Sequence, residues 1–421
     1  MRLTADASRV VVRPFHIAVA PAGVIMKGPS RVLRIVEAVA MMGQDETASS
    51  LSSVLRDFET RHWQMREVFL RRYSEVIAQI PFDPSGLSDT AKQLIGAYFC
   101  HEYSYAAAAL MNPSVVEHPD QSGLEDGARR VILSLRAVGE GHISSIAFRE
   151  GILGPGPAFE LAPEPPFATA ARLVGGQDHL DGPVTVERHP DSTISGTVMF
   201  PVTPMQSNGL EDLRMVGFTH DDGRREVLGT YTAYNGRQIQ SELMRTDDFR
   251  CFDLAPMTGS AARNKGMAIF PRTVGGRYWT LGRQDGENLF IISSDDPGHW
   301  DEGRMLLAPK YNWEMIQIGN CGSPIELDEG WLVLTHGVGA MRKYSIGACL
   351  LDKDEPSRVL ARTPSPILSA LDEDREGYVP NVVYTCGALR HGDLLFIPYG
   401  VADSSVAFAF VPIKALLNAM V

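Results

Sequence analysis

Apolar residues recur at helical spacing in the first quarter of the chain, from about Ser30 to Ala109. Leu51, Val54, Leu55 and Phe58, for example, follow one another at the intervals that place them on one face of a helix. A break rich in Pro and Gly follows, and Ser88 then stands where a further helix towards Ala109 would begin. We therefore predict a mostly helical N-terminal segment, residues 1–98, with two or three helices. These helices would cover one face of the main domain or make a subunit contact in a homo-oligomer.

The pattern changes from about Asn112 onward to short β-rich runs separated by turns. Turns occur at Asp221-Asp222-Gly223, Gly275-Gly276, Asp328-Glu329-Gly330 and His391-Gly392-Asp393, about 53, 53 and 63 residues apart, with an earlier copy near Glu125-Asp126-Gly127. A Pro-rich insertion, Pro155 to about Pro201, separates the first two copies. A unit of about 50–60 residues with about four strands is typical of a propeller blade. We predict an all-β main domain, residues 99–421, built as a five-bladed β-propeller, with a large β-sandwich as the rival.

The formal net charge of −12 over 421 residues argues against nucleic acid and anionic membranes as partners, because both would repel the chain. The five cysteines form no CxxC pair, and their odd number fits a reducing compartment. The N-terminus shows no signal-peptide pattern, and no window reaches the roughly 18–20 apolar residues of a membrane span. We therefore expect a soluble cytoplasmic protein.

The segment Gly209–Arg214 carries the most informative chemistry, because Glu211 and Asp212 stand together beside Arg214. A neighbouring negative charge raises the pKa of a carboxyl and a cation lowers it, so adjacent acids can differ in proton affinity. Acid catalysis on sugars uses such a difference. On a regular strand the two acids would point to opposite faces, so we expect only Asp212 to face a central channel and Glu211 to be a structural hydrogen-bond acceptor.

Other candidate residues lie at strand ends and loops, where an exposed or turn-capping role is the plain alternative to a site role. They are Lys265 before an apolar strand, Arg283 and Glu287 in one loop, His336 at a strand end, and Asp403 among small residues. The eleven histidines show no metal-ligand spacing, so we assign no metal and no cofactor. The chain has no Gly-rich phosphate loop, no GxSxG elbow and no Cys/His pairing, which argues against nucleotide-binding and serine- or cysteine-hydrolase functions.

These positions also resemble glycoside hydrolase family 130, the β-mannoside phosphorylases and β-mannosidases, over about three-quarters of the chain. The matching pieces occur in order: Asn112-Pro113; Leu135-Arg136; Gly209–Arg214; Tyr231-Thr232-Ala233-Tyr234; Lys265 with Phe270-Pro271; Gly330-Trp331 through His336-Gly337; Gly347–Asp352 with Pro356-Ser357 and Arg362; Val379–Val383; and Tyr399-Gly400 with Asp403. The resemblance implies a five-bladed propeller and an inverting reaction on a β-linked mannoside. It makes Asp212 the proton donor, acting through a hydroxyl of the bound mannose, and puts Asn112, Arg136, Lys265 and Asp403 near the sugar or the attacking group.

The chain departs from the family pattern at positions that bear on phosphate. Leu213 replaces the Pro of the family's Glu-Asp-Pro-Arg motif. Gln240 and Gly282 stand where the phosphorylases carry an Arg and a His, although Arg283 remains and Arg237 is a substitute cation. Weaker phosphate capture would favour hydrolysis, which needs a carboxylate base about 6.5–9.5 Å from the acid. Glu287 is our first candidate for that base and Glu314 the second.

We therefore predict an inverting β-mannosidase, of the β-1,2 type, with Asp212 as general acid. The substrate-binding residues we assign are Asn112, Arg136, Ser144, Arg214, Tyr234, Lys265, Arg283, His336 and Asp403. The alternative at the same site is a phosphorylase that uses inorganic phosphate as co-substrate and releases α-mannose 1-phosphate. A different class is a propeller that binds a small oligosaccharide without turnover.

Overall fold

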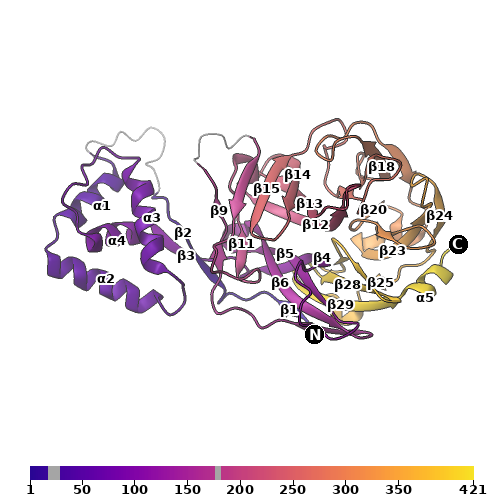
Figure 1. Cartoon of the computed structure of the whole chain (residues 1–421), viewed down its shortest axis with the longest axis horizontal. Coiled ribbons are helices and arrows are strands. Elements are labelled where there is room, and N and C mark those ends of the chain that lie inside the picture. Colours follow the sequence, from indigo (N-terminus) through magenta and orange to yellow (C-terminus); the bar gives the residue numbers. More distant parts are fainter. Residues whose placement is uncertain (18–28, 176–181) are drawn as a thin grey trace. The chain divides into compact units, whose positions relative to one another are not determined.

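The chain folds into two compact units, one helical and one rich in strands (Figure 1). The computed structural model describes residues 1–17, 29–175 and 182–421, so part of the predicted Pro-rich insertion, residues 176–181, lies outside the described residues. The strand-rich unit comprises Met1–Ala7, Tyr105–Pro165 and Ala171–Val421. The helical unit comprises Ser8–Ser104 and Pro166–Ala170.

In its described residues the helical unit contains four helices rather than the two or three expected. Its elements are β2 (Val10–Pro14), α1 (Arg31–Ala40), α2 (Gln44–Phe58), α3 (Met65–Ile77), α4 (Asp89–Tyr98), β3 (Cys100–Ser104) and β8 (Thr169–Ala170). Ser30 and Ser88 cap α1 and α4, each side chain accepting a hydrogen bond at 3.1 Å from the main-chain N–H three residues ahead. The helix that begins after Ser88 ends at Tyr98 and does not continue towards Ala109, because β3 follows it and pairs with β2.

The strand-rich unit consists of mainly antiparallel sheets, which confirms the all-β main domain. The largest sheet contains β4 (Ala109–Glu117), β5 (Arg129–Val138), β6 (Ser144–Gly154), β7 (Ala158–Leu161), β9 (Arg172–Leu173), β10 (Val184–Glu187), β11 (Thr197–Met199), β12 (Gly209–Thr219), β13 (Arg225–Tyr234), β14 (Ile239–Thr246) and β15 (Cys251–Pro256). A second contains β16 (Ala268–Ile269), β17 (Tyr278–Gly282), β18 (Leu289–Ser294) and β19 (Arg304–Leu307).

Two further sheets complete this unit. One contains β20 (Gln317–Asn320), β21 (Ile325–Glu326), β22 (Trp331–Val338), β23 (Tyr344–Leu351), β24 (Val359–Arg362) and β25 (Leu368–Ser369). The other contains β26 (Val383–Tyr384), β27 (Leu389–His391), β28 (Leu394–Val401), β29 (Ser405–Pro412) and, from the other end of the chain, β1 (Leu3–Thr4). The short helix α5 (Ile413–Asn418) follows β29.

The turns read from the sequence each join two antiparallel strands, as predicted. They connect β4 to β5, β12 to β13, β16 to β17, β21 to β22, and β27 to β28. The first strand of the chain, β1, adds to the edge of the last sheet, where Leu3 pairs with Val406 and Thr4 with Ser405.

Apolar packing between neighbouring sheets forms the core of the strand-rich unit. Every residue of β22 is buried, as expected for a strand that is covered on both faces. One core cluster joins β17 and β18 to β22 and β23, with Leu281, Ile291, Trp331 and Cys349 among its members. Within the described ranges no helix is long and apolar enough to cross a membrane.

Candidate functional site

A β-bulge in β12 brings both acids of the Gly209–Arg214 segment to one place. The pairing of β12 with β13 shifts register between Glu211 and Arg214, and Asp212 adopts a left-handed backbone with φ of 55°. The bulge breaks the alternation of side chains, so Arg136 contacts both acids. Its Nη2 lies 2.8 Å from Glu211 Oε1 and its Nη1 3.3 Å from Asp212 Oδ1. The expectation that the acids point to opposite faces is therefore wrong.

A matching bulge in β4 supplies the next contact. The register of β4 against β5 shifts between Met111 and Ser114, and Asn112 has φ of 48°. Asn112 Nδ2 donates a hydrogen bond to Asp212 Oδ1 at 2.7 Å. Ser144, at the start of β6, accepts a hydrogen bond from Arg136 Nε at 2.9 Å. Four of the predicted site residues thus form one hydrogen-bonded group.

Lys265 joins this group through the second acid. Its Nζ lies 2.5 Å from Glu211 Oε2, so Glu211 is held between two cations, Lys265 and Arg136. Glu211 therefore acts as a hydrogen-bond acceptor that fixes the two cations. This leaves Asp212 as the acid with a single strong donor, the Asn112 amide, and a longer contact to Arg136.

The two site aspartates have opposite pKa shifts. Burial would raise the pKa of Asp212, yet Arg136, Arg214 and Lys265, together with the Asn112 amide, lower it to about 2. Burial, reinforced by the charge of Asp212, raises the pKa of Asp403 to about 6 against the opposing charges of Arg136 and Arg342. Asp212 is therefore a carboxylate at neutral pH, and Asp403 is the easier group to protonate.

Arg283 and His336 form a second group beside the first. His336 Nδ1 donates to the carbonyl oxygen of Asn320 at 3.1 Å, so its Nε2 accepts from Arg283 Nη1 at 3.5 Å and Gln317 Nε2 at 3.4 Å. Burial lowers the pKa of His336 well below its usual value, and the charges of Arg283 and Arg214 lower it further. The imidazole is therefore neutral, and it orients Arg283 without competing with it for an anion.

Two glycines make room for the Arg283 side chain. Gly266 has φ of 97°, and a Cβ built there would lie 3.0 Å from Arg283 Nε. A Cβ at Gly319 would lie 2.5 Å from Arg283 Cδ. Among the described residues, no acceptor lies within hydrogen-bond reach of the buried Arg283 Nε. The buried Nε of Arg283 is a donor without an acceptor, and the side chain that carries it packs against Gly266, the residue after Lys265. Such a donor is suited to an anion.

Arg214 supports the site from inside the protein. It is 2% exposed, and its Nε, Nη1 and Nη2 donate to the carbonyl oxygens of Cys321 and Asp212 and to the hydroxyl of Tyr384 at 2.8, 2.8 and 2.7 Å. All three nitrogens are engaged with protein acceptors. This contrasts with the substrate-binding role expected from the sequence.

Among the described residues, neither predicted base is hydrogen-bonded or ion-paired to the group around Asp212. Glu314 is fully buried, pairs with Arg362, and accepts hydrogen bonds from the main chain of Lys310 and Tyr311. Glu287 is exposed, in a turn closed by Asp285. Over the described ranges, no recorded hydrogen bond or ion pair links either glutamate to Asp212.

Tyr234 ends β13, opposite Gly209, and is half-buried. Sequence reasoning missed Asn320, Gln317 and Tyr384, which contact the predicted residues. Asn320 precedes Cys321-Gly322 and Tyr384 lies in an ordinary apolar strand, so neither has a local signal beyond a buried polar residue.

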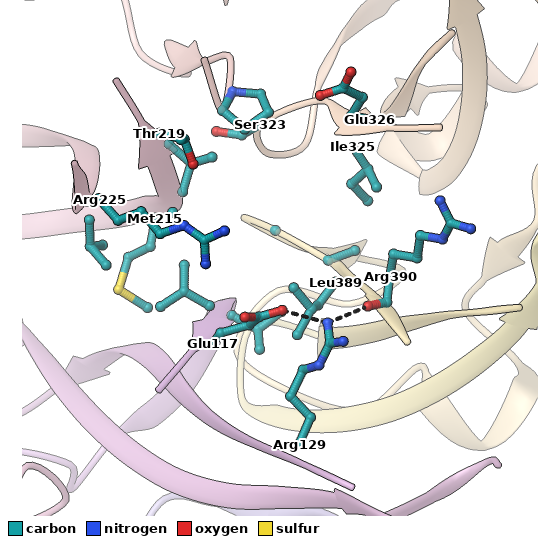
Figure 2. Close-up of a pocket in the computed structure, with 18 of the residues that line it drawn as sticks. Glu117, Arg129, Met215, Thr219, Arg225, Ser323, Ile325, Glu326, Leu389 and Arg390 are labelled. Atoms are coloured by element: carbon teal, nitrogen blue, oxygen red, sulfur yellow. Dashed lines mark hydrogen bonds and ion pairs between the residues drawn. The ribbon is translucent and has the colours of Figure 1, made fainter. Parts of the chain in front are cut away.

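A cavity with a volume of about 920 Å³ lies outside this group of residues. Its wall includes Met215 and Thr219 of β12, with Glu117 and Arg129 forming an ion pair on one side (Figure 2). Asp212 does not line this cavity, which holds none of the predicted site residues. Among the described residues, no cluster of three His, Cys, Asp or Glu side chains could hold a metal ion.

Comparison with known proteins places the site in a family. Residues 169–421, more than half of the chain, match the model of glycoside hydrolase family 130, described as β-1,4-mannooligosaccharide phosphorylase. This segment contains Asp212, Lys265, Arg283, His336 and Asp403, whereas Asn112 and Arg136 precede it.

Two curated relatives and one solved structure carry related names. A β-1,2-mannobiose phosphorylase of Listeria innocua is 32% identical over 52% of this chain and 62% of its own length, so the chain spans less than two-thirds of that relative. A 1,2-β-oligomannan phosphorylase of Thermoanaerobacter sp. is 37% identical over 52% of this chain and 73% of its own length.

The solved structure of the Listeria innocua β-1,2-mannobiose phosphorylase in complex with β-1,2-mannobiose superposes with a TM-score of 0.50 at 25% identity. It covers 74% of this chain and 92% of that one. Because the family model matches more than half of the chain, the chain belongs to glycoside hydrolase family 130.

Proposed function

We propose that this chain is an inverting β-mannoside phosphorylase that transfers a mannosyl group from a β-linked mannoside to inorganic phosphate, releasing α-mannose 1-phosphate. The observation that carries the proposal is Arg283, whose buried Nε has no acceptor among the described residues while Gly266, Gly319 and His336 hold the side chain in place. A guanidinium held in a fixed orientation suits a phosphate dianion. The phosphorylase names of the relatives point the same way.

The reaction assigns a separate task to each of the two groups. A phosphate oxygen forms a bond to C1 of the mannosyl group as the glycosidic C–O bond breaks, and the proton of Asp212 passes to the leaving oxygen. Asn112, Arg136, Ser144, Tyr234 and Asp403 would hold the terminal sugar. Holding sugar and phosphate together in one orientation supplies much of the rate.

The pKa of Asp212 requires an explanation, because a carboxyl with a pKa of about 2 holds no proton at neutral pH. Three nearby cations, Arg136, Arg214 and Lys265, keep it ionised. A phosphate dianion bound beside Lys265 would offset part of that positive charge, and a bound sugar would exclude water. Both effects raise the pKa of Asp212, so the binding of substrate would favour protonation of this carboxylate.

Hydrolysis, which the sequence favoured, is less well supported. It needs a free carboxylate to activate water. Glu314 is buried and paired with Arg362, and Glu287 is exposed in a turn. The substitutions at Gln240 and Gly282 still favour weak phosphate binding, so hydrolysis remains an outcome of the test below.

We further propose that the strand-rich unit is a five-bladed propeller. The units would begin with β4, β12, β16, β20 and β26, and contacts in or next to these first strands link the units. The fourth and fifth units pack closely, since a Cβ built at Gly322 would lie 2.5 Å from the Cys386 carbonyl oxygen. Asn112 bonds Asp212, Lys265 bonds Glu211, and Asn320 Nδ2 donates to the Gly266 carbonyl. The main-chain N–H of Cys386 donates to the Pro113 carbonyl, which joins the last unit to the first. Such a ring of contacts is expected where first strands surround a common axis.

The test is the turnover of β-1,2-mannobiose by the full chain as phosphate is varied. The proposal predicts a rate that saturates with phosphate and vanishes without it. Mannose release at the same rate in the absence of phosphate would overturn the proposal in favour of hydrolysis. Saturable sugar binding with no turnover under either condition would indicate a non-catalytic sugar-binding protein.

A further inference from the structure

Arg214 makes three hydrogen bonds that tie together three separate strands of the chain. It donates to the carbonyl of Asp212 in the β12 bulge, to the carbonyl of Cys321 after β20, and to the hydroxyl of Tyr384 in β26. The acceptors are as many as 172 residues apart in sequence, from 212 to 384. The guanidinium therefore fixes the backbone of the proton donor to two distant parts of the fold.

The planar fork of Arg is needed for this arrangement. An Arg presents N–H groups in fixed directions, whereas a Lys ammonium is a point charge on a flexible stem. Because Arg214 is 2% exposed, its donors cannot be satisfied by bulk water. Loss of one acceptor would leave a buried N–H without a partner, which is costly.

Tyr384 carries the connection onward to the anion-binding group. Its ring meets the His336 ring edge to face, with centroids 5.0 Å apart and planes at 64°. His336 in turn faces Arg283 through Nε2. A continuous path of contacts thus runs from Asp212 through Arg214, Tyr384 and His336 to Arg283.

We infer that Arg214 and Tyr384 act as positioning residues, forming a brace beneath the site that sets the geometry of Asp212 relative to Arg283. Neither residue touches the reacting atoms. The kinetic test of this inference rests on the proposed function. The brace itself consists of contacts between protein groups and does not depend on which reaction is catalysed.

The brace also contributes to the charge environment of Asp212. The Asn112 amide donates a hydrogen bond to this carboxyl. The charged groups around it are Arg136, Lys265, Glu211, Asp403 and the buried Arg214. Arg214 is one of three cations among them. Shifting its charge away from Asp212 therefore raises the proton affinity of the carboxyl, unless another cation moves closer.

The test is a double-mutant cycle with Arg214→Lys and Tyr384→Phe in the full chain. Each single variant should lower kcat by about 10-fold or more with the KM for mannoside within about 2-fold, as expected when orientation is lost and sugar contacts remain. The double variant should lose little more than the worse single variant, because both changes break the same connection. Effects that multiply independently would overturn the inference.

Matched controls separate the brace from general loss of stability. Arg272→Lys removes a bidentate ion pair with Glu326, and Tyr399→Phe alters a half-buried tyrosine of β28 away from the brace. Both controls should keep kcat within about 2-fold. If either brace variant fails to fold, the other still tests the inference through its split between kcat and KM.

A second readout does not depend on turnover. Carbon-13 NMR titration of the Asp212 carboxyl should show a higher pKa in Arg214→Lys than in the wild type. An unchanged titration together with unchanged kcat in both variants would overturn the brace. A wild-type enzyme that shows no dependence on phosphate would instead overturn only the proposed function.

Discussion

Asn112 Nδ2 lies 2.7 Å from Asp212 Oδ1, although the two residues are 100 positions apart in the chain. Each residue sits in a β-bulge with a left-handed backbone, one in β4 and the other in β12. Left-handed conformations of non-Gly residues are uncommon and concentrate at functional sites. The two bulges therefore bring the side chains of Asn112 and Asp212 into contact, and they place Asp212 in the site.

Replacing Asn112 by Ala removes the donor that faces Asp212. We expect kcat to fall by about 10- to 100-fold and the pKa of Asp212 to rise, because a hydrogen bond to the charged form is lost. Steady-state kinetics and carbon-13 NMR titration measure the two effects. Asn288→Ala, which alters an amide bonded to Asp285 in an exposed turn, is the control and should leave both unchanged. Equal behaviour of the two variants would contradict the role of Asn112.

Asp212→Asn should abolish most of the activity and spare sugar binding. Removal of a general acid typically costs about 10²–10⁴-fold in rate, while Arg136 and Asp403 remain to hold the sugar. Calorimetric titration with mannobiose measures the binding, and a rate assay on the same preparation measures the loss of activity. A variant that retains more than about a tenth of wild-type kcat would exclude Asp212 as the proton donor.

Gly266→Ala tests the space around Arg283. The new Cβ would lie 3.0 Å from Arg283 Nε at a φ of 97°, so the guanidinium must move. We expect the KM for phosphate to rise by about 10-fold or more with a smaller effect on the KM for mannoside. Gly275→Ala is the matched control, because Gly275 also has positive φ but nothing lies within 4 Å of its Cβ. A larger effect on mannoside than on phosphate would argue against an anion site at Arg283.

Asp403→Asn should make the protein more stable at alkaline pH. Its folded-state pKa of about 6 is above the usual value, so the native state binds a proton more tightly than the unfolded chain. Stability therefore falls as the pH rises from about 4 to 6 and stays lower above that range. The Asn variant avoids this loss, with a gain on the order of 1–3 kcal/mol at pH 8 and little change at pH 4.

Thermal unfolding at both pH values measures that difference. The same variant should bind mannoside more weakly, because a carboxylate that faces the sugar is lost. A gain in the midpoint temperature that is equal at pH 4 and pH 8 would show that burial and the charge of Asp212 do not govern this group.

The glutamates proposed from the sequence as bases give a contrasting pair of variants. Glu287→Gln should keep activity within about 2-fold, since the Glu287 side chain is exposed and makes no hydrogen bond or ion pair to Asp212 among the described residues. Glu314→Gln should instead destabilise the fold by about 3–5 kcal/mol, because Arg362 loses its buried partner. Denaturant unfolding and the rate assay separate the two outcomes. Loss of activity in Glu287→Gln without loss of stability would support hydrolysis, with Glu287 as the base.

Local chemistry explains which parts of the fold were predictable. The turns at Asp222-Gly223 and Gly275-Gly276 need backbone conformations that Gly supplies, so the sequence marks them directly. The N-cap of Ser88 is equally local, but the end of its helix at Tyr98 is not, because pairing of β2 with β3 competes with helix propensity.

The arrangement of the site depended on non-local contacts. The alternation of side chains along a regular strand predicts that Glu211 and Asp212 lie on opposite faces. The bulge in β12 against β13 breaks this alternation, and Arg136 therefore contacts both acids. Nothing near Glu314 in the sequence signals Arg362, its partner 48 residues later. From the sequence, Arg214 is expected to be a surface cation or a ligand-binding cation. Its structural role becomes evident only from its contacts with Tyr384 and Cys321, which are distant in the chain.

A time course of the reaction by phosphorus-31 and proton NMR tests the central claim most directly, using β-1,2-mannobiose, inorganic phosphate and the full chain. An acid at Asp212 and a phosphate held by Arg283 on the opposite face of the sugar predict that α-mannose 1-phosphate is the first product and accumulates in step with mannose. Formation of the β-anomer, or of free mannose alone with no new phosphorus signal, would contradict this account.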